Sequence, residues 1–592
     1  MRPLENLNIL PGLYSLQTDR GAVRRWKTGD KVRFHNGLPQ KIGGWQKASQ
    51  NTFVGKCRGI SDWQALSLAK HIALGTDKKL EIWSGGTVYD ITPLRTSGTL
   101  AADPIATTNT STTVTITHAS HAQLVGDYVH YSGAAAVGGI TISGEYTVVT
   151  VVDANSYTIT HSAAATSTAT GGGAAVAYEY EIHIGAVDSY YGLGWGAGLY
   201  GASTYGTARS VSNFLLAART WTLDQWGEDL IACPRSGGIY RWDTSTGTGT
   251  RAAVISQAPT TAKAIMVSPE AQHLLAFGAY DGAADDPLLI RWCSSGDYTS
   301  WTAANSNSAG SKRLNTGNEI LCGVKGNGEI DVFTDSHLWR MTYVGPPDVF
   351  AFKAIGQNGG IRGPHAVVEM DGIIYWMAEK DFFSYDGSIH VLPCDVWPTV
   401  FDDLNFVQRQ KTFGFVNRRF GEIWWLYCSA DATEIDSYVF YNVADKTWSF
   451  GTITRTAAVG DSDVYSSPFA AGTDSYLYDH ETTVNADGSA LAASLSSGDI
   501  EIAEGDYLMQ IGALVPDFKT LTGSVTLTLT AKKYPQDSDS QSETSLTVTS
   551  STKFVNPRIK GRQISIQIAS SAVDDNWRLG TLRIGVKPHG KK

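Results

Sequence analysis

A strand that ends in an aromatic residue and a turn returns at loosely regular intervals along this chain. The markers of this unit are spaced 50, 47, 46, 56 and 37 residues apart; they are Trp242, Trp292, Trp339, Tyr385, Tyr441 and Tyr478. A period of about 40–50 residues with several strands per unit is typical of a β-propeller, in which each blade is a four-stranded sheet. The segment Glu81–Gly86 resembles one more blade end, so we expect six or seven blades.

The repeat does not cover the whole chain of 592 residues, which is too long for one hydrophobic core. Residues 94–178 are almost free of Lys and Arg and contain short strands of alternating polarity, which predicts a small inserted β module. Alternating strands such as Ser524–Ala531 predict a C-terminal β-sandwich. An irregular β-sandwich with accidental spacing remains the alternative to the propeller, because the repeat carries no WD or kelch motif.

These observations predict an all-β chain: a propeller with an inserted module and a terminal sandwich. The expected parts are an N-terminal arm with platform strands (1–60), a first blade (61–93), the inserted module (94–178), the main propeller (179–489) and the C-terminal sandwich and platform (490–592). No run approaches eighteen apolar residues, so we expect no membrane span, and the first residues show no secretory signal.

Charge is segregated along the sequence. Residues 20–58 carry a net charge of +9 and residues 553–592 carry +7, whereas the whole chain carries −10, which leaves about −25 for residues 59–552. If the two ends meet in space, they form one basic platform. The acidic body would repel a polyanion such as DNA, so we expect no direct nucleic-acid binding by the body.

Motifs for catalysis or cofactor binding are weak. Gly196, Gly198 and Gly201 match G-x-G-x-x-G, but no strand precedes them and no amphipathic helix follows, as a dinucleotide site requires. His480-Glu481 lacks the second histidine of a zincin helix. The six cysteines form no C-x-x-C pair, which favours reduced, buried thiols. We therefore expect no catalytic residues, no cofactor and no metal.

Two other classes of function stay open. One is a monomeric propeller that binds a glycan or a protein through its loops. The other is a glycoside hydrolase that uses a pair of carboxylates, for which the candidates are Asp285, Asp286, Asp402 and Asp403. Adjacent acids at turns are more commonly capping or solvated residues, so we do not favour the hydrolase. The binding module also stays a second choice.

The ends of the chain resemble a known family. Residues 25–45 (RWKTGDKVRFHNGLPQKIGGW) are similar to the opening W-x-x-G-D-x-V-R-F-x-N-G-x-P-x-K-x-G-G-W of the tail tube, or nozzle, proteins of short-tailed bacteriophages. Near the other end, Pro516-Asp517-Phe518, the run Arg558-x-x-Gly561-Arg562-Gln563 and Trp577-x-Leu-Gly580 are also similar to that family. The resemblance covers both ends and extends to the propeller only in pattern.

The resemblance implies a structural virion protein without catalysis. It implies a homohexameric ring under the head-to-tail adaptor, enclosing the channel for genome ejection and carrying tail fibres or spikes, with a tail needle or plug as a further partner. Such a protein is assembled in the host cytoplasm and resides in the virion tail. We expect the contacts with the adaptor or a neighbouring subunit to involve basic and aromatic residues of both ends, namely Arg24, Arg25, Trp26, Arg33, Trp45, Arg558, Arg562 and Trp577.

Overall fold

The computed structural model describes residues 4–191, 215–357, 360–501, 506–535, 537 and 542–590. They form two compact units: one contains Phe53–Asn315, and the other joins Met1–Thr52 with Thr316–Lys592. Strands dominate both units, and one short α-helix, α1 (Trp397–Phe401), follows strand β36 (Ile389–Leu392). The G-x-G-x-x-G segment at 196–201 lies outside the described residues.

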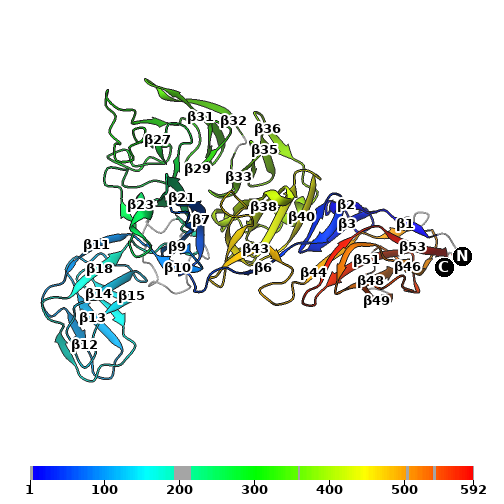
Figure 1. The fold of residues 1–592 in the computed structure, drawn as a ribbon, viewed down its shortest axis with the longest axis horizontal. Coiled ribbons are helices and arrows are strands. Elements are labelled where there is room, and N and C mark those ends of the chain that lie inside the picture. The colour runs from blue at the N-terminus through cyan, green and yellow to red at the C-terminus, as the bar shows by residue number, and fades with distance from the viewer. Residues whose placement is uncertain are drawn as a thin grey trace, which may run out of the picture. The chain divides into compact units, whose positions relative to one another are not determined.

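Among the described residues, seven four-stranded antiparallel sheets follow in chain order, interrupted after the first by the inserted module, as the blades of a propeller do (Figure 1). The unit that contains Phe53–Asn315 holds three of them, in which the strands pair in chain order. Their strands are β7 (Cys57–Gln64), β8 (Lys70–Thr76), β9 (Leu80–Ser84) and β10 (Thr87–Asp90); β21 (Trp221–Trp226), β22 (Asp229–Pro234), β23 (Tyr240–Trp242) and β24 (Ala253–Val254); β25 (Ala264–Val267), β26 (Leu274–Phe277), β27 (Leu289–Trp292) and β28 (Gly310–Arg313).

The other unit holds four blade sheets. Their strands are β29 (Ile320–Lys325), β30 (Ile330–Thr334), β31 (His337–Gly345) and β32 (Val349–Gln357); β33 (Val367–Met370), β34 (Ile373–Met377), β35 (Phe382–Tyr385) and β36; β37 (Phe413–Asn417), β38 (Glu422–Tyr427), β39 (Ser437–Asn442) and β40 (Thr447–Thr452); β41 (Arg455–Val459), β42 (Phe469–Gly472), β43 (Leu477–Thr483) and β6 (Gly44–Lys47). In the last sheet, β6 comes from the N-terminal part of the chain and pairs with β43.

The predicted all-β fold is confirmed, and each aromatic marker of the repeat lies in the third strand of a blade. Trp83 occupies that place in the first blade and Tyr478 in the last, which gives seven blades. Strand β38 shows how the aromatics pack: Trp424 stacks on Phe440, whereas Trp425 packs on Phe382 from the opposite face of the sheet. Adjacent aromatics thus fill two layers of blade packing.

The inserted module is an eight-stranded sheet with its own core. Its strands run from residue 94 to 181: β11 (Leu94–Thr99), β12 (Ile105–Thr107), β13 (Thr113–Thr117), β14 (Tyr128–Ser132), β15 (Gly144–Asp153), β16 (Ser156–Thr160), β17 (Ala169–Gly171) and β18 (Ala177–Glu181). A two-residue pair, β19 (Tyr190–Tyr191) with β20 (Leu215–Leu216), follows the module. The hydroxyl groups of Tyr131, Tyr157 and Tyr180 form a buried hydrogen-bonded chain inside it.

The terminal sandwich contains strands from both ends of the chain. They are β1 (Glu5–Leu7), β2 (Leu10–Leu13), β3 (Arg25–Asp30), β4 (Val32–His35), β5 (Leu38–Lys41), β44 (Ala493–Ser497), β45 (Ile500–Glu501), β46 (Met509–Val515), β47 (Phe518–Thr522), β48 (Ser524–Lys532), β49 (Ser542–Thr549), β50 (Ile559–Gly561), β51 (Gln563–Ser570), β52 (Asn576–Leu579) and β53 (Leu582–Pro588). The described residues 4–60 add strands to other parts of the fold: β1–β5 complete the sandwich, β6 completes a blade, and β7 begins another.

Candidate functional site on the basic terminal sandwich

The two basic ends of the chain pair directly with each other. Strand β1 lies antiparallel to β53, and β3 pairs with β44 (Figure 1). Strand β5 pairs with β52. The hydrophobic core between the sheets includes Trp26 and Phe34 from the N-terminal part together with Leu527, Ile566 and Trp577 from the C-terminal part. Sequence segments about 500 residues apart therefore build one body, and their basic residues share its surface.

The N-terminal residues predicted to contact a partner divide by exposure. Arg24 is exposed in the turn before β3, and Arg25 is half-buried, with its guanidinium 4.9 Å from the ring of Tyr14. Trp26 is only 2% exposed and belongs to the core. Trp45 is partly buried, with its ring 5.2 Å from His480.

Arg33 is an internal ion-pair partner rather than a surface residue. Its side chain is 0% exposed, and it donates to Glu422 at 3.1 Å and to Glu481 at 2.6 Å. Burial alone would lower the pKa of Arg33, but the two carboxylates raise it above its usual value. Arg33 thereby joins β4 of the sandwich to β38 and β43 of two blades, and it is unavailable to a partner protein.

The C-terminal residues divide in the same way. Arg558 is exposed, and Arg562 is half-buried with its guanidinium 5.8 Å from the ring of Tyr534. Trp577 is 1% exposed and donates its indole N–H to Ser570 Oγ at 3.1 Å. Trp26, Arg33 and Trp577 thus pack within the chain, whereas Arg24 and Arg558 face solvent.

The sandwich carries a group of basic residues that our residue-by-residue prediction missed. Lys560 and Lys587 both lie opposite Gln510 across neighbouring strands, so they share one face of the sheet β1-β53-β46-β50. Arg583 lies four residues before Lys587 on β53 and points to the same side. We call Lys560, Arg583 and Lys587 the basic face. The alternation Leu582-Arg583-Ile584 was the sequence signal, because Leu582 and Ile584 are buried and Arg583 between them is exposed.

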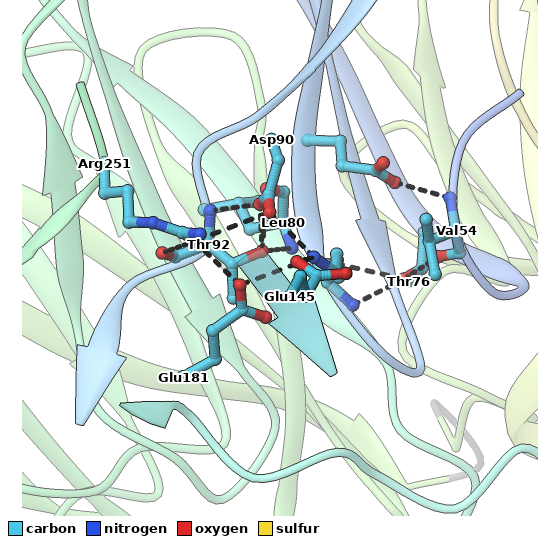
Figure 2. A network of polar contacts seen from close by, with 10 residues as sticks. Val54, Thr76, Leu80, Asp90, Thr92, Glu145, Glu181 and Arg251 are labelled. Atoms are coloured by element: carbon cyan, nitrogen blue, oxygen red, sulfur yellow. Dashed lines mark hydrogen bonds and ion pairs between the residues drawn. The ribbon is translucent and has the colours of Figure 1, made fainter. Parts of the chain in front are cut away.

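A second charged cluster joins the inserted module to the blades of the same unit (Figure 2). The ammonium of Lys79 lies 2.8 Å from Asp90, 2.5 Å from Glu145 of β15 and 3.4 Å from Glu181 of β18. Arg251 donates to Glu181 at 2.9 Å. Burial raises the pKa of Glu181 to about 7, and burial alone would lower the pKa of Lys79, whereas Glu181 and Asp90 raise it.

This cluster has the donor types of a cation site but not its electrostatics. Carboxylate oxygens of Asp90, Glu145 and Glu181 lie within 4.8 Å of one another. Lys79 and Arg251 already supply two positive charges among these oxygens, so a bound metal ion would be repelled by both. The cluster instead fixes the attachment of the module to the first two blades.

The carboxylates considered for hydrolysis occupy separate turns. Asp286 accepts from Leu288 N–H and pairs with Arg313 at 2.7 Å, and Asp285 accepts from the Thr261 hydroxyl. Asp403 accepts from Ala430 N–H at 3.2 Å, and Asp402 caps the end of α1. These contacts are those of turn and cap residues.

A polar pocket of about 200 Å³ lies between two adjacent blades, and no sequence motif pointed to it. Its charged residues are Glu329, Asp331, Arg340 and Asp386. Arg340 contacts Glu329 at 2.5 Å, and burial raises the pKa of Asp331 to about 6. The pocket can accept hydrogen bonds from a polar small molecule.

The six cysteines are free thiols. None of the six forms a disulfide; five are buried and Cys394 is half-buried. Burial raises the pKa of Cys57 and Cys233 to about 12, so these thiols stay protonated. No helix among the described residues has the length and apolar character that crossing a membrane requires.

Comparisons with known proteins identify no family. No protein-family model matches the chain, and no curated protein sequence matches it. Among solved structures, the chain is similar to a phage phi92 endosialidase at 11% identity, covering 93% of this chain and 88% of that one, with a TM-score of 0.22. A chain of a mitotic checkpoint complex is similar at 8% identity over 45% of this chain and 89% of that one, with a TM-score of 0.26.

A third similar structure is the extracellular domain of a hybrid two-component system from B. thetaiotaomicron, at 9% identity over 88% of this chain and 72% of that one, with a TM-score of 0.27. Superpositions this loose carry no argument about function. The functional interpretation therefore depends on the chain's own residues.

Proposed function

We propose that this protein is a structural component of the tail of a short-tailed bacteriophage, forming the nozzle below the head-to-tail adaptor. The observation that carries the proposal is that both basic ends fold into one sandwich with the basic face on its surface, while residues 59–552 carry about −25. The similarity of residues 25–45 to the nozzle family supports the same function. No catalytic role is part of the proposal.

The charge distribution suits a conduit. DNA carries one negative charge per about 1.7 Å of helix, so a basic channel would hold it by releasing counterions. An acidic wall gives the genome no such binding energy. The basic sandwich is suited to dock on an acidic surface of the adaptor, because complementary charge speeds and orients association.

Subunit contacts follow from the same proposal. A closed ring made from one kind of chain requires a head-to-tail interface whose repeated rotation brings the last subunit into contact with the first. We propose a homohexamer, with fibres or spikes and a plug or needle as further partners in the virion tail. Stiff sheets with short connections are suited to such a wall, because they keep their shape under load.

The experiment that tests the proposal is charge reversal of the basic face. A triple variant, Lys560→Glu with Arg583→Glu and Lys587→Glu, should fold and form rings but no longer join the adaptor in a tail-assembly mixture viewed by electron microscopy. The matched control reverses three exposed lysines of the blades, Lys312, Lys353 and Lys446, and should assemble normally. Arg33 is left unchanged because it is buried.

Two outcomes would contradict the proposal. One is normal assembly of the triple variant with the adaptor. The other is a ringless monomer that binds or cleaves a sugar saturably. The polar pocket around Asp331 would then favour a binding module, and cleavage would favour a glycoside hydrolase.

A further inference from the structure

Strand β49 leaves one side of a long sheet edge open. Its eight residues pair with β48 in unbroken register, from Ser524 opposite Thr549 to Ala531 opposite Ser542. Within the part of the chain that the structure describes, no strand pairs with its other side. In an antiparallel edge strand, every second residue directs its N–H and C=O away from the sheet, so about four donors and four acceptors face outward.

This edge lacks the protection that edge strands usually carry. Natural edges are short, charged, bulged, interrupted by proline or covered. Strand β49 has no lysine, arginine or proline, and Glu543 is its one charged residue. The strand is rich in threonine and valine, residues that favour extended structure.

Several other edges of the described chain are protected. The edge strands β1, β24 and β50 have three residues or fewer. Strand β28 ends in Lys312-Arg313, and β32 carries Lys353. Strand β2, at the opposite edge of the β49 sheet, is covered by β40, since a Cβ at Gly12 would lie 3.2 Å from Thr447 Cβ. The open side of β49 has none of these forms of protection.

The surroundings of the edge are basic. Lys533 is exposed directly after β48, the strand that pairs with β49, and Lys553 and Arg558 are exposed in the segment that joins β49 to β50. Lys560 of β50 follows on the opposite sheet. Against these four cations stand Glu543 and Asp537, and Asp537 accepts from the backbone N–H groups of Lys533 and Tyr534. The remaining net charge is positive, so the edge attracts an acidic peptide more than a basic one.

We propose that the open side of β49 is a docking site for an extended, acidic segment of a partner protein, which adds to the sheet as the next strand. Main-chain hydrogen bonds would supply affinity, and the lysines and arginine around the edge would select acidic side chains. The inference goes beyond the nozzle function, because it holds for any partner that offers such a segment.

The probe is an eight-residue peptide with alternating Thr/Val and Asp residues, labelled with a fluorophore, added to the full-length chain. We expect saturable binding by fluorescence anisotropy, which weakens as salt rises, and slower amide exchange of Glu543–Thr549 in the complex. The same peptide with Lys in place of Asp should bind at least tenfold more weakly. Two further acidic peptides carry methyl groups on every second backbone nitrogen, one on the odd-numbered and one on the even-numbered residues. Only the peptide whose free N–H groups face β49 should bind.

Proline variants test the edge itself. Thr544→Pro and Ser545→Pro are adjacent, so one removes an outward N–H and the other removes a bond to β48. The outward variant should keep the wild-type unfolding temperature and lose peptide binding. The double variant Lys533→Glu with Lys553→Glu should weaken binding tenfold or more, whereas Lys312→Glu with Lys353→Glu should leave it unchanged.

Three results would overturn the proposal. The first is no binding of the acidic peptide to the wild-type chain. The second is strong protection of the outward-facing β49 amides in the free monomeric chain, which would show that its own residues cover the edge. The third is self-association that the outward proline abolishes, which would assign the edge to a second copy. None of them decides whether the basic face joins the adaptor.

Discussion

At the scale of single residues, burial separates structural charges from surface charges. Arg24 and Arg33 lie nine positions apart in the same basic stretch, yet one faces solvent and the other is enclosed by Glu422 and Glu481. A buried arginine that pairs with two carboxylates holds together the strands on which these carboxylates lie. Removing the arginine leaves the two carboxylates without a counter-charge. The basic composition of a segment therefore does not by itself indicate a binding surface.

We predict that Arg33→Ala destabilises the unit containing the sandwich by about 3–5 kcal/mol, because Glu422 and Glu481 remain buried without a counter-charge. Denaturant unfolding followed by tryptophan fluorescence measures the loss. Arg24→Ala is the matched control and should change stability by less than about 0.5 kcal/mol, since its side chain is exposed. Equal stability of the two variants would contradict the assigned ion pairs.

A second residue-scale prediction concerns Glu81, a buried carboxyl of β9 that accepts from Val54 N–H at 2.9 Å. Burial raises its pKa from 4.5 to about 8. The folded chain therefore keeps a proton that the unfolded chain releases between these pH values, so this group makes stability fall as pH rises through that window.

Glu81→Gln should match the wild type at pH 4.5 and exceed it by about 2–4 kcal/mol at pH 9, because the amide never ionises. The free energy of unfolding measured across this pH range tests the sign. The exposed Glu270→Gln, in the same unit, is the control and should follow the wild-type curve. A wild-type stability that rises relative to Glu81→Gln with pH would show the opposite sign.

At the scale of elements, strands distant in sequence complete each other's sheets. Strand β6 closes the last blade beside β43, and β1–β5 close the sheets of the sandwich. Local signals identified β48, which was predicted at Ser524–Ala531, because alternation of polarity is a local property. The partners of β4 and β6 are far away in the chain, so periodicity carried no information about them.

We predict that Gly44→Ala displaces β6 from the last blade. A Cβ at this position would overlap backbone atoms of Asn485, which cannot move without breaking the pairing with β6. The cost should be about 3 kcal/mol. Hydrogen exchange should show faster exchange in β43.

Gly37→Ala is the control for this glycine. Gly37 has a positive φ, of 72°, unlike Gly44, and no atom lies within 4 Å of the added methyl group. Its cost should be only the backbone strain of about 1 kcal/mol, with exchange in β43 unchanged. Similar effects of the two alanines would contradict the close packing at Gly44.

At the scale of the whole molecule, segregated charge and stiff sheets are the properties on which the proposed conduit depends. The basic ends (residues 20–58 and 553–592) and the acidic residues 59–552 carry opposite net charges, which allows one chain both to bind an acidic neighbour and to repel a nucleic acid. The buried cluster of Lys79, Glu145 and Glu181 gives the inserted module a firm attachment to its blade.

The sequence alone determined the fold class, the blade repeat, the inserted module and the basic ends, because periodicity, composition and charge are read along the chain. Only the tertiary structure decided which of the predicted contact residues are exposed. It showed that Trp26, Arg33 and Trp577 are internal and that Lys560, Arg583 and Lys587 share a face. Exposure and shared faces depend on pairing between β1–β5 and strands about 500 residues away, and such long-range register leaves no local pattern.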